Sequence, residues 1–203
     1  MNMQLTVILS HYLDTYLCSL LYICHQITNL PRSLKLTMSK TIGKDNVTEH
    51  IIPDRVSNTA WISEGDFNGK LLPRITKRLE LATGLSAYGA EPYQVLNYGI
   101  GGHYKPHLDC PPNFKLQRVA TMLIYLSDVE YGGGTVFVKH GVRAEPKKGD
   151  ATFWFNLNKA GETDLSTKHA GCPVLLGEKW VVNKWFNYHE QFSTRKCGLS
   201  PDE

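Results

Sequence analysis

The sequence predicts an α+β fold in which helices come first and short strands follow. Apolar residues recur at helical spacing in the first part of the chain, and short apolar or alternating stretches begin at Tyr93. Gly, Pro and Asp separate these stretches, as expected for turns. The length of 203 residues suits one domain. Many short strands at such spacing indicate a β-sandwich or an open barrel, with the helices supporting one sheet.

The first predicted element is a helix over residues 10–28, which Pro31 ends because proline disfavours helical geometry in the residue before it. The apolar stretch Leu5–Cys24 contains His11 and Asp14, and no basic residue precedes it. A helix packed on a core is therefore favoured over a membrane span or a signal peptide.

A hairpin is predicted over residues 33–62, with its loop at Gly43–Asn46. Helical spacing of Leu and Ile predicts a second helix over residues 67–84, with Gly84 as its cap. The strands predicted after this helix are Gln94–Tyr98, Tyr104–Asp109, Arg118–Leu126, Thr135–Val138, Ala151–Asn156, Gly171–Leu176 and Lys179–Phe186.

Charge and cysteine content exclude some classes of function. The net charge is +3, and Lys and Arg are interleaved with acidic residues, so the sequence does not predict nucleic-acid binding. None of the five cysteines forms a CxxC pair, so a thiolate zinc site or a redox motif is not indicated. Cysteine count alone leaves the cellular compartment open.

The sharpest local motif is His107–Leu108–Asp109. On a strand, residues two apart point to the same face, so an imidazole and a carboxylate would stand side by side. His169 would supply a second imidazole if both segments line one barrel. Two histidines and one carboxylate with open positions form the facial triad of non-haem Fe(II) oxygenases. No other histidine is assigned as a ligand, and His103 is expected in a loop.

Lys179 is an independent indication of a ligand site. It lies among apolar neighbours on a predicted strand, where an ammonium group is costly unless it meets an anion. We therefore expect it to bind a dicarboxylate as a point charge, with Thr135 and Tyr98 as hydroxyl donors. Taken singly, each of these three residues also has an ordinary structural interpretation: a surface lysine, a β-former and a core aromatic.

Residues 31–197 resemble the catalytic domain of the collagen prolyl 4-hydroxylase α subunit. The matching blocks occur in the family's order and are Gln94–His107 (QVLNYGIGGHYKPH), Arg118–Asp128 (RVATMLIYLSD), Gly132–Phe137 (GGGTVF), Pro146–Leu157 (PKKGDATFWFNL) and Lys168–Trp185 (KHAGCPVLLGEKWVVNKW). The resemblance implies a double-stranded β-helix (jelly-roll) core. It leaves residues 1–30 as a divergent, helical N-terminal segment and 198–203 as a tail.

The resemblance also implies a reaction and a set of site residues. The reaction is hydroxylation of proline in procollagen-like or other proline-rich peptides, using O2, coupled to oxidative decarboxylation of 2-oxoglutarate to succinate and CO2, with L-ascorbate as reductant. The implied roles are Fe(II) binding by His107, Asp109 and His169, binding of the 2-oxoglutarate distal carboxylate by Lys179 with Tyr98 and Thr135, a pocket lining by Trp185, and peptide contacts by Tyr104 and Arg118.

Further implications concern the compartment and partners. The resemblance implies a Cys172–Cys197 disulfide and the endoplasmic reticulum lumen, with which the Asn46 glycosylation sequon is compatible. The family's dimerisation region and separate peptide-binding domain have no counterpart here, which argues against assembly with protein disulfide isomerase. A catalytically impaired peptide-binding paralogue or fragment stays open as an alternative. A zinc hydrolase with the same ligands is ranked last, because it gives Lys179 and Thr135 no role.

Overall fold

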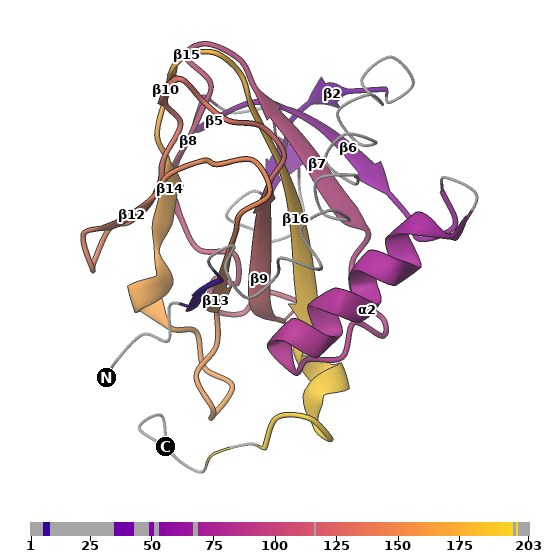
Figure 1. Ribbon diagram of the computed structural model, residues 1–203. Helices are drawn as coiled ribbons and strands as arrows, with labels where there is room; N and C mark the ends of the chain where they lie inside the picture. Colours follow the sequence, from indigo (N-terminus) through magenta and orange to yellow (C-terminus); the bar gives the residue numbers. More distant parts are fainter. Residues whose placement is uncertain are drawn as a thin grey trace.

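The computed structural model describes residues 6–8, 35–42, 49–50, 53–66, 69–115, 117–196 and 198. They form two antiparallel sheets that face each other in a jelly roll, with a helix on the outside (Figure 1). The large sheet contains, in spatial order, β1 (Thr6–Ile8), β13 (Ala151–Phe155), β9 (Arg118–Tyr125), β16 (Lys179–Asn187), β7 (Tyr93–Tyr98), β6 (Asn58–Ile62) and β2 (Thr37–Met38).

The small sheet contains, in spatial order, β12 (Val142–Ala144), β11 (Thr135–Phe137), β14 (His169–Gly171), β8 (His103–His107) and β5 (Arg55–Val56). Two strand pairs lie beside these sheets, namely β3 (Thr41–Ile42) with β4 (Glu49–His50) and β10 (Tyr131–Gly132) with β15 (Val174–Leu176). Single turns of 3₁₀-helix occur at η3 (Leu165–Thr167) and η4 (Tyr188–Gln191).

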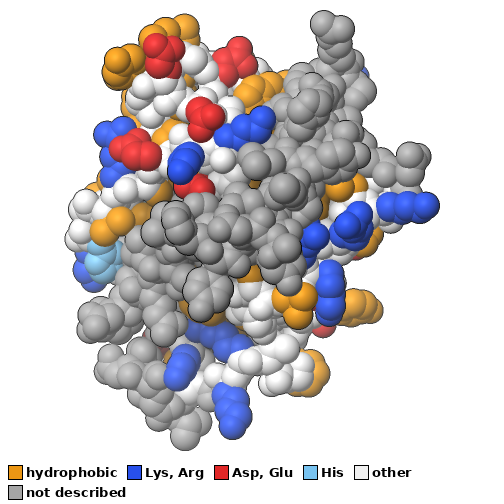
Figure 2. All heavy atoms as spheres, in the orientation of Figure 1, with side chains coloured by type: hydrophobic (Ala, Val, Ile, Leu, Met, Phe, Trp, Pro, Cys, Tyr) orange, Lys and Arg blue, Asp and Glu red, His pale blue; other side chains and the backbone are white. Residues whose placement is uncertain are grey.

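Helix α2 (Leu71–Thr83) packs on the outer face of the large sheet (Figure 1). Its buried residues follow one stripe at helical spacing: Leu72, Ile75, Thr76 and Leu79. Arg74 and Lys77 are exposed, and Figure 2 shows Lys and Arg side chains on the side of the molecule where α2 lies. Gly84 ends the helix in the left-handed conformation, with φ 70°. The predicted second helix is thus confirmed, with its first turn starting at Leu71.

The large sheet separates two apolar cores. In β7, Val95 packs into the core beneath α2, whereas Leu96 packs into the core between the two sheets. Ile124 and Leu123 of β9 divide in the same way. Neighbouring residues of a strand face opposite sides, so a strand covered on both faces becomes a continuous apolar run. This explains why the central strands were recognisable in the sequence.

The boundaries of two predicted strands are wrong. The predicted strand Gly171–Leu176 is divided at Cys172–Pro173 into β14, which pairs with β11 and β8, and β15, which pairs with β10. Proline has no N–H for a sheet ladder, which favours a break there. Strand β8 begins at His103, which therefore is not a loop residue, and it ends at His107 rather than Asp109.

The N-terminal predictions are tested only in part. Thr6–Ile8 is an edge strand paired with β13, so these residues of the segment 1–30 are not helical. The predicted helix 10–28, the Gly43–Asn46 loop and Cys197 lie outside the described residues. The antiparallel pairing of β3 with β4 agrees with the predicted hairpin. Within the described part of the chain, no helix has the length and apolar content needed to span a membrane.

Candidate active site

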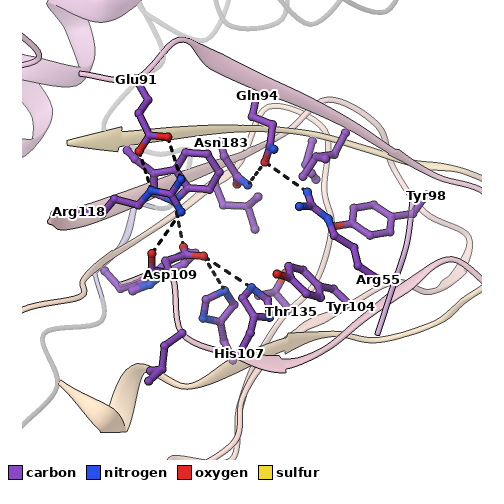
Figure 3. A pocket seen from close by; sticks show the side chains of 18 of the residues that line it. Arg55, Glu91, Gln94, Tyr98, Tyr104, His107, Asp109, Arg118, Thr135 and Asn183 are labelled. Atoms are coloured by element: carbon purple, nitrogen blue, oxygen red, sulfur yellow. Dashed lines mark hydrogen bonds and ion pairs between the residues drawn. The ribbon is translucent and has the colours of Figure 1, made fainter. Parts of the chain in front are cut away.

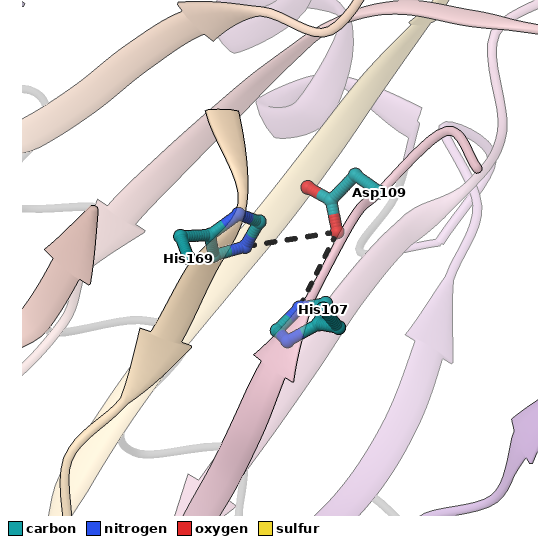
Figure 4. A group of neighbouring side chains, drawn as sticks. All are labelled: His107, Asp109 and His169. Carbon is teal, nitrogen blue, oxygen red and sulfur yellow. Dashed lines mark ion pairs between the residues drawn. The ribbon is translucent and has the colours of Figure 1, made fainter. Parts of the chain in front are cut away.

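The side chains of His107, Asp109 and His169 point toward one another (Figure 4). Their strands are neighbours in the small sheet, where His169 of β14 pairs with His107 of β8. Nε2 of His107 lies 3.6 Å from Oδ1 of Asp109, and Nε2 of His169 lies 3.9 Å from the same oxygen. Asp109 reaches this position from the bend that follows β8 and not from the strand itself. The prediction that His107 and Asp109 share one face of a strand is therefore wrong.

Each imidazole has one nitrogen occupied and one free. Nδ1 of His107 lies 2.8 Å from the carbonyl oxygen of Lys105, and Nδ1 of His169 lies 3.0 Å from that of Thr167. A carbonyl only accepts, so Nδ1 of each ring carries the hydrogen and Nε2 keeps its lone pair. Backbone carbonyls that fix the tautomer in this way are typical of metal-binding histidines.

The two oxygens of the Asp109 carboxylate also have different partners. Its Oδ2 accepts a 2.7 Å hydrogen bond from Thr121 Oγ1 and a 3.2 Å hydrogen bond from Trp185 Nε1. Oδ1 therefore faces the two free imidazole nitrogens. One ligand atom from each residue lies within 4.8 Å of the others, so a single ion can be reached by all three. Two nitrogens and one carboxylate oxygen fit Fe(II) with open coordination positions.

Electrostatics agree with this arrangement. Burial raises the pKa of Asp109, but the nearby histidines and Arg118 outweigh burial and hold the pKa well below its ordinary value. Burial, followed by the neighbouring His107, lowers the pKa of His169 to about 4. The site at neutral pH is thus an ionised carboxylate with a neutral His169, which are the protonation states that metal binding requires.

Lys179 lies buried in the same cavity, with 4% of its surface exposed. Its ammonium nitrogen is 3.4 Å from Thr135 Oγ1 and 5.6 Å from the centre of the Tyr98 ring. Tyr125 OH donates to Thr135 Oγ1 at 3.0 Å. Burial lowers the pKa of Lys179 to about 8. Among the residues that the structure describes, no carboxylate forms an ion pair with Lys179, so this group is suited to an incoming anion.

The glycine segment Gly132–Gly134, which leads from β10 into β11, brings Thr135 to this position. Gly132 has φ 82°, and a Cβ there would overlap the carbonyl oxygen of Pro173. Only glycine allows so close an approach of two backbone segments, so the GGGTVF block has a structural reason.

Arg118 lines the same cavity. Its guanidinium binds Glu91 through two hydrogen bonds of 2.6 and 2.8 Å and donates to the carbonyl oxygen of Asp109 at 3.2 Å (Figure 3). It also stacks on Trp185, with Cζ 3.8 Å from the ring centre. Tyr104 stacks on His107, with ring centroids 3.5 Å apart. Arg118 and Tyr104 were both predicted to face the peptide. In the structure Arg118 contacts Asp109 and Trp185, and Tyr104 contacts His107.

All nine predicted site residues outside the disulfide line one cavity of about 460 Å³. They are Tyr98, Tyr104, His107, Asp109, Arg118, Thr135, His169, Lys179 and Trp185. The expected Cys172–Cys197 pair stays a prediction, because Cys197 lies outside the described residues. Trp185 was expected only as an aromatic lining, whereas its indole N–H holds the Asp109 carboxylate.

Arg55 and Trp154 are two of the cavity residues that the sequence analysis did not identify. Arg55 lies on the side of the cavity away from Arg118, and its guanidinium contacts Gln94 Oε1 at 3.3 Å (Figure 3). Trp154 packs against His169, with ring centroids 4.8 Å apart. The usable signal for Arg55 was a charged residue in a short strand, which is weak. Trp154 reads as ordinary core in an apolar run.

Residues 93–187 match the family described as the 2OG-Fe(II) oxygenase superfamily. The chain is 45% identical over 179 residues to prolyl 4-hydroxylase subunit alpha-1 of Homo sapiens, covering 84% of this chain and 33% of that protein. It is 46% identical over 157 residues to prolyl 4-hydroxylase subunit alpha-2 of Caenorhabditis elegans, covering 73% of this chain and 29% of that protein. The chain thus spans about a third of the length of these relatives.

Among solved structures, the fold is similar to a viral collagen prolyl hydroxylase from Paramecium Bursaria Chlorella virus-1 in complex with 2OG. The TM-score is 0.61 at 25% identity, and the match covers 81% of this chain and 89% of that chain. The geometry of the His–Asp–His group, the sequence match and the fold agree. Residues 93–187 are therefore a 2OG-Fe(II) oxygenase domain, in a chain that resembles prolyl 4-hydroxylase alpha subunits over most of its length.

Proposed function

We propose that the chain is a prolyl 4-hydroxylase that acts on procollagen-like or other proline-rich peptides and converts 2-oxoglutarate to succinate and CO2. The observation that carries the proposal is one cavity that contains both the His–Asp–His group and a buried lysine without a carboxylate partner among the described residues. A metal site alone fits many enzymes. A metal site that shares a cavity with an anion site fits a chelating dicarboxylate cosubstrate.

In this proposal the residues have separate tasks. His107, Asp109 and His169 would hold Fe(II), which together with 2-oxoglutarate and O2 supplies the oxidising power for hydroxylation. Lys179 and Thr135 would bind the distal carboxylate and so orient the cosubstrate. The apolar side chains of Leu96, Leu123 and Val181 line the cavity and are buried, which keeps water away from the reacting groups.

The opening of the cavity suits a proline-rich peptide. Trp61, which is 47% exposed, lies against Trp185 with ring centroids 6.0 Å apart. Phe114 and Tyr104 add further aromatic surface to the lining. Aromatic grooves bind extended proline-rich segments because these segments have little conformational entropy to lose. Arg118, held by Glu91, would add hydrogen-bond donors for peptide carbonyls.

The test is mass spectrometry of a (Pro-Pro-Gly)n peptide after incubation with the protein, Fe(II), 2-oxoglutarate and L-ascorbate. We expect the mass of one oxygen atom per modified proline, and one succinate per hydroxylation. His107→Ala and Asp109→Ala are expected to abolish both products. Unchanged succinate formation in these variants would refute the proposal.

A panel of proline-rich peptides that are not collagen-like separates two substrate classes with the same chemistry. Iron binding without any turnover of 2-oxoglutarate on every peptide would instead favour the catalytically impaired paralogue.

Compartment and partners follow from the proposal only through the resemblance. We expect the endoplasmic reticulum lumen, and glycosylation at Asn46 in cells would test this placement. Non-reducing peptide mapping would test the Cys172–Cys197 disulfide. Co-purification with protein disulfide isomerase would test that partner.

A further inference from the structure

A buried chain of hydrogen bonds supports the Asp109 carboxylate from behind. Asn156 Nδ2 donates to Thr121 Oγ1 at 2.9 Å, and Thr121 Oγ1 donates to Asp109 Oδ2 at 2.7 Å. Thr121 and Asn156 are 0% and 1% exposed. Both residues lie in segments that otherwise consist largely of apolar core, so their polar atoms need a reason to be there.

The direction of these hydrogen bonds follows from the carboxylate of Asp109, at which they end. An ionised carboxylate can only accept, so the single hydrogen of Thr121 must point at Asp109 Oδ2. Thr121 Oγ1 is then left as an acceptor, which requires the amide nitrogen of Asn156, and not its oxygen, at the other end. Successive donors that all point toward one anion polarise each other and strengthen the final bond.

Asn156 has no second side-chain use within the described structure. Its Oδ1 is buried and accepts no hydrogen bond there. Its backbone is fixed on both sides, because its N–H donates to Val119 at 2.8 Å and its carbonyl accepts from Asp164 at 2.9 Å. Among the described residues, the side chain of Asn156 thus contacts the site through its donor half, by the bond from Nδ2 to Thr121.

Strand register places the supports in one line. Thr121 of β9 pairs with Trp154 of β13 on one side and with Trp185 of β16 on the other. Directly opposite residues of neighbouring strands share a face, so all three face the metal centre. Trp154 packs on His169, while Thr121 and Trp185 both bind Asp109 Oδ2. Residues of the large sheet thus contact candidate ligands that lie on the small sheet and on the bend after β8.

We infer that Thr121, with Asn156 behind it, is a positioning residue that holds Asp109 so that only Oδ1 is offered to the metal. The inference rests on the proposed metal site but not on the identity of the substrate. Partners that orient a ligand typically contribute about 10-fold to 100-fold in metal affinity.

The experiment measures metal affinity and not turnover. Metal-free protein is titrated with Co(II), which is redox-silent, and the visible absorption of bound Co(II) gives both the dissociation constant and a signature of ligand geometry. Thr121→Val removes the hydroxyl and keeps the shape of the side chain. We expect it to weaken Co(II) binding by about 10-fold to 100-fold and to alter the spectrum.

Thr121→Ser separates positioning from packing. Serine keeps the donor but leaves a methyl-sized gap, so a packing role would make Thr121→Ser the more damaged variant. A positioning role gives the opposite order of Co(II) affinity, with Thr121→Ser near wild type. Thr59→Val is the matched control, because Thr59 is a buried threonine in β6 of the same sheet whose hydroxyl donates to the Val95 carbonyl, outside the cavity lining.

The role of Asn156 is tested by a double-mutant cycle. Asn156→Leu alone is expected to weaken Co(II) binding several-fold, whereas in the Thr121→Val background it should have no further effect, because the chain is already broken. If Thr121→Val does not fold, Thr121→Cys, a weak donor, takes its place and should lie between wild type and complete loss. Wild-type Co(II) affinity in Thr121→Val, a weaker Thr121→Ser than Thr121→Val, or additive effects of the two substitutions would overturn the inference.

These outcomes are independent of the proposed hydroxylase activity. A protein that binds Co(II) in the expected order but oxidises no peptide would leave the inference intact and would refute the proposed function.

Discussion

The ammonium nitrogen of Lys179 lies 3.4 Å from the hydroxyl oxygen of Thr135, within the cavity that also contains the three candidate metal ligands. Threonine is a neutral partner and cannot balance a buried charge. Burial therefore lowers the pKa of Lys179 from 10.5 to about 8. The charge of Lys179 should destabilise the protein while the cavity is empty and should bind the 2-oxoglutarate carboxylate when the cavity is occupied. Each of these two expectations leads to a prediction.

The affinity for 2-oxoglutarate should fall as pH rises through about 8. The dicarboxylate requires the charged ammonium, and the free protein loses that charge above this pKa. Below it the dissociation constant should be constant, and above it should rise by up to about tenfold per pH unit. Calorimetry with Mn(II), without O2, measures this profile. Lys179→Arg keeps its charge throughout, so a sloping profile in wild type and a flat one in this variant are expected; a flat wild-type profile would contradict the prediction.

Lys179→Met should stabilise the ligand-free protein at neutral pH. Methionine has a similar length and removes a buried charge that has no carboxylate partner in the described structure, which we expect to add about 1 kcal/mol to the free energy of unfolding. Between pH 8 and the ordinary lysine pKa of 10.5, the unfolded chain keeps this lysine protonated while the folded protein releases the proton. The free energy of unfolding of wild type therefore rises above pH 8, and the difference in stability between wild type and Lys179→Met narrows. Urea unfolding measures both effects. A variant that is less stable than wild type at neutral pH would show that Lys179 has a stabilising partner.

Arg118→Lys should raise the KM for peptide about tenfold while the KM for 2-oxoglutarate stays unchanged. Lysine cannot reproduce the two bonds to Glu91, the stacking on Trp185 and the bond to the Asp109 carbonyl at once. Steady-state kinetics with each substrate varied in turn measures the two constants. Arg74→Lys, on the exposed face of α2, is the control and should change neither constant. Equal loss for both substrates would place Arg118 in the support of the metal site and not in peptide binding.

Gly84→Ala should lower the free energy of unfolding by about 1 kcal/mol without changing peptide or 2-oxoglutarate affinity. Gly84 has φ 70°, and nothing lies within 4 Å of an added Cβ, so the loss reports backbone strain alone. Gly65 has equally open surroundings and no positive φ, which makes Gly65→Ala the matched control. Thermal unfolding compares the two. Equal behaviour of both variants would mean that the left-handed cap of α2 contributes nothing measurable.

The sequence was informative where one physical rule dominates. The end of the helix at Gly84 and four central strands of the large sheet follow periodicity and burial. These strands, β7, β9, β13 and β16, were predicted to within one residue at each end. The predicted site residues depended on chemistry that is rare outside such sites: two imidazoles with a carboxylate, and a lysine in an apolar strand. The structure brings these residues together in one cavity, and their individual roles in binding metal and cosubstrate stay predictions.

What could not be predicted depends on contacts between distant segments. The division of Gly171–Leu176 into two strands is decided by their different partners, and the position of Asp109 by a bend after β8. Thr121 and Asn156 carried a usable signal, since a polar residue inside an apolar run needs a partner. The sequence gives no means of naming that partner, because the hydrogen bonds to Asp109 exist only once the two sheets are face to face.

The pairing of His169 with His107 has a consequence for how the protein matures. The two histidines come from strands that are far apart in the chain and neighbours only in the finished small sheet. Long-range pairing of this kind forms slowly, because a large loop must close before any contact rewards it. A nascent chain that ends before β14 has emerged lacks one of the three ligands. If these three residues hold the iron as proposed, the complete set of ligands forms only once β14 has paired with β8.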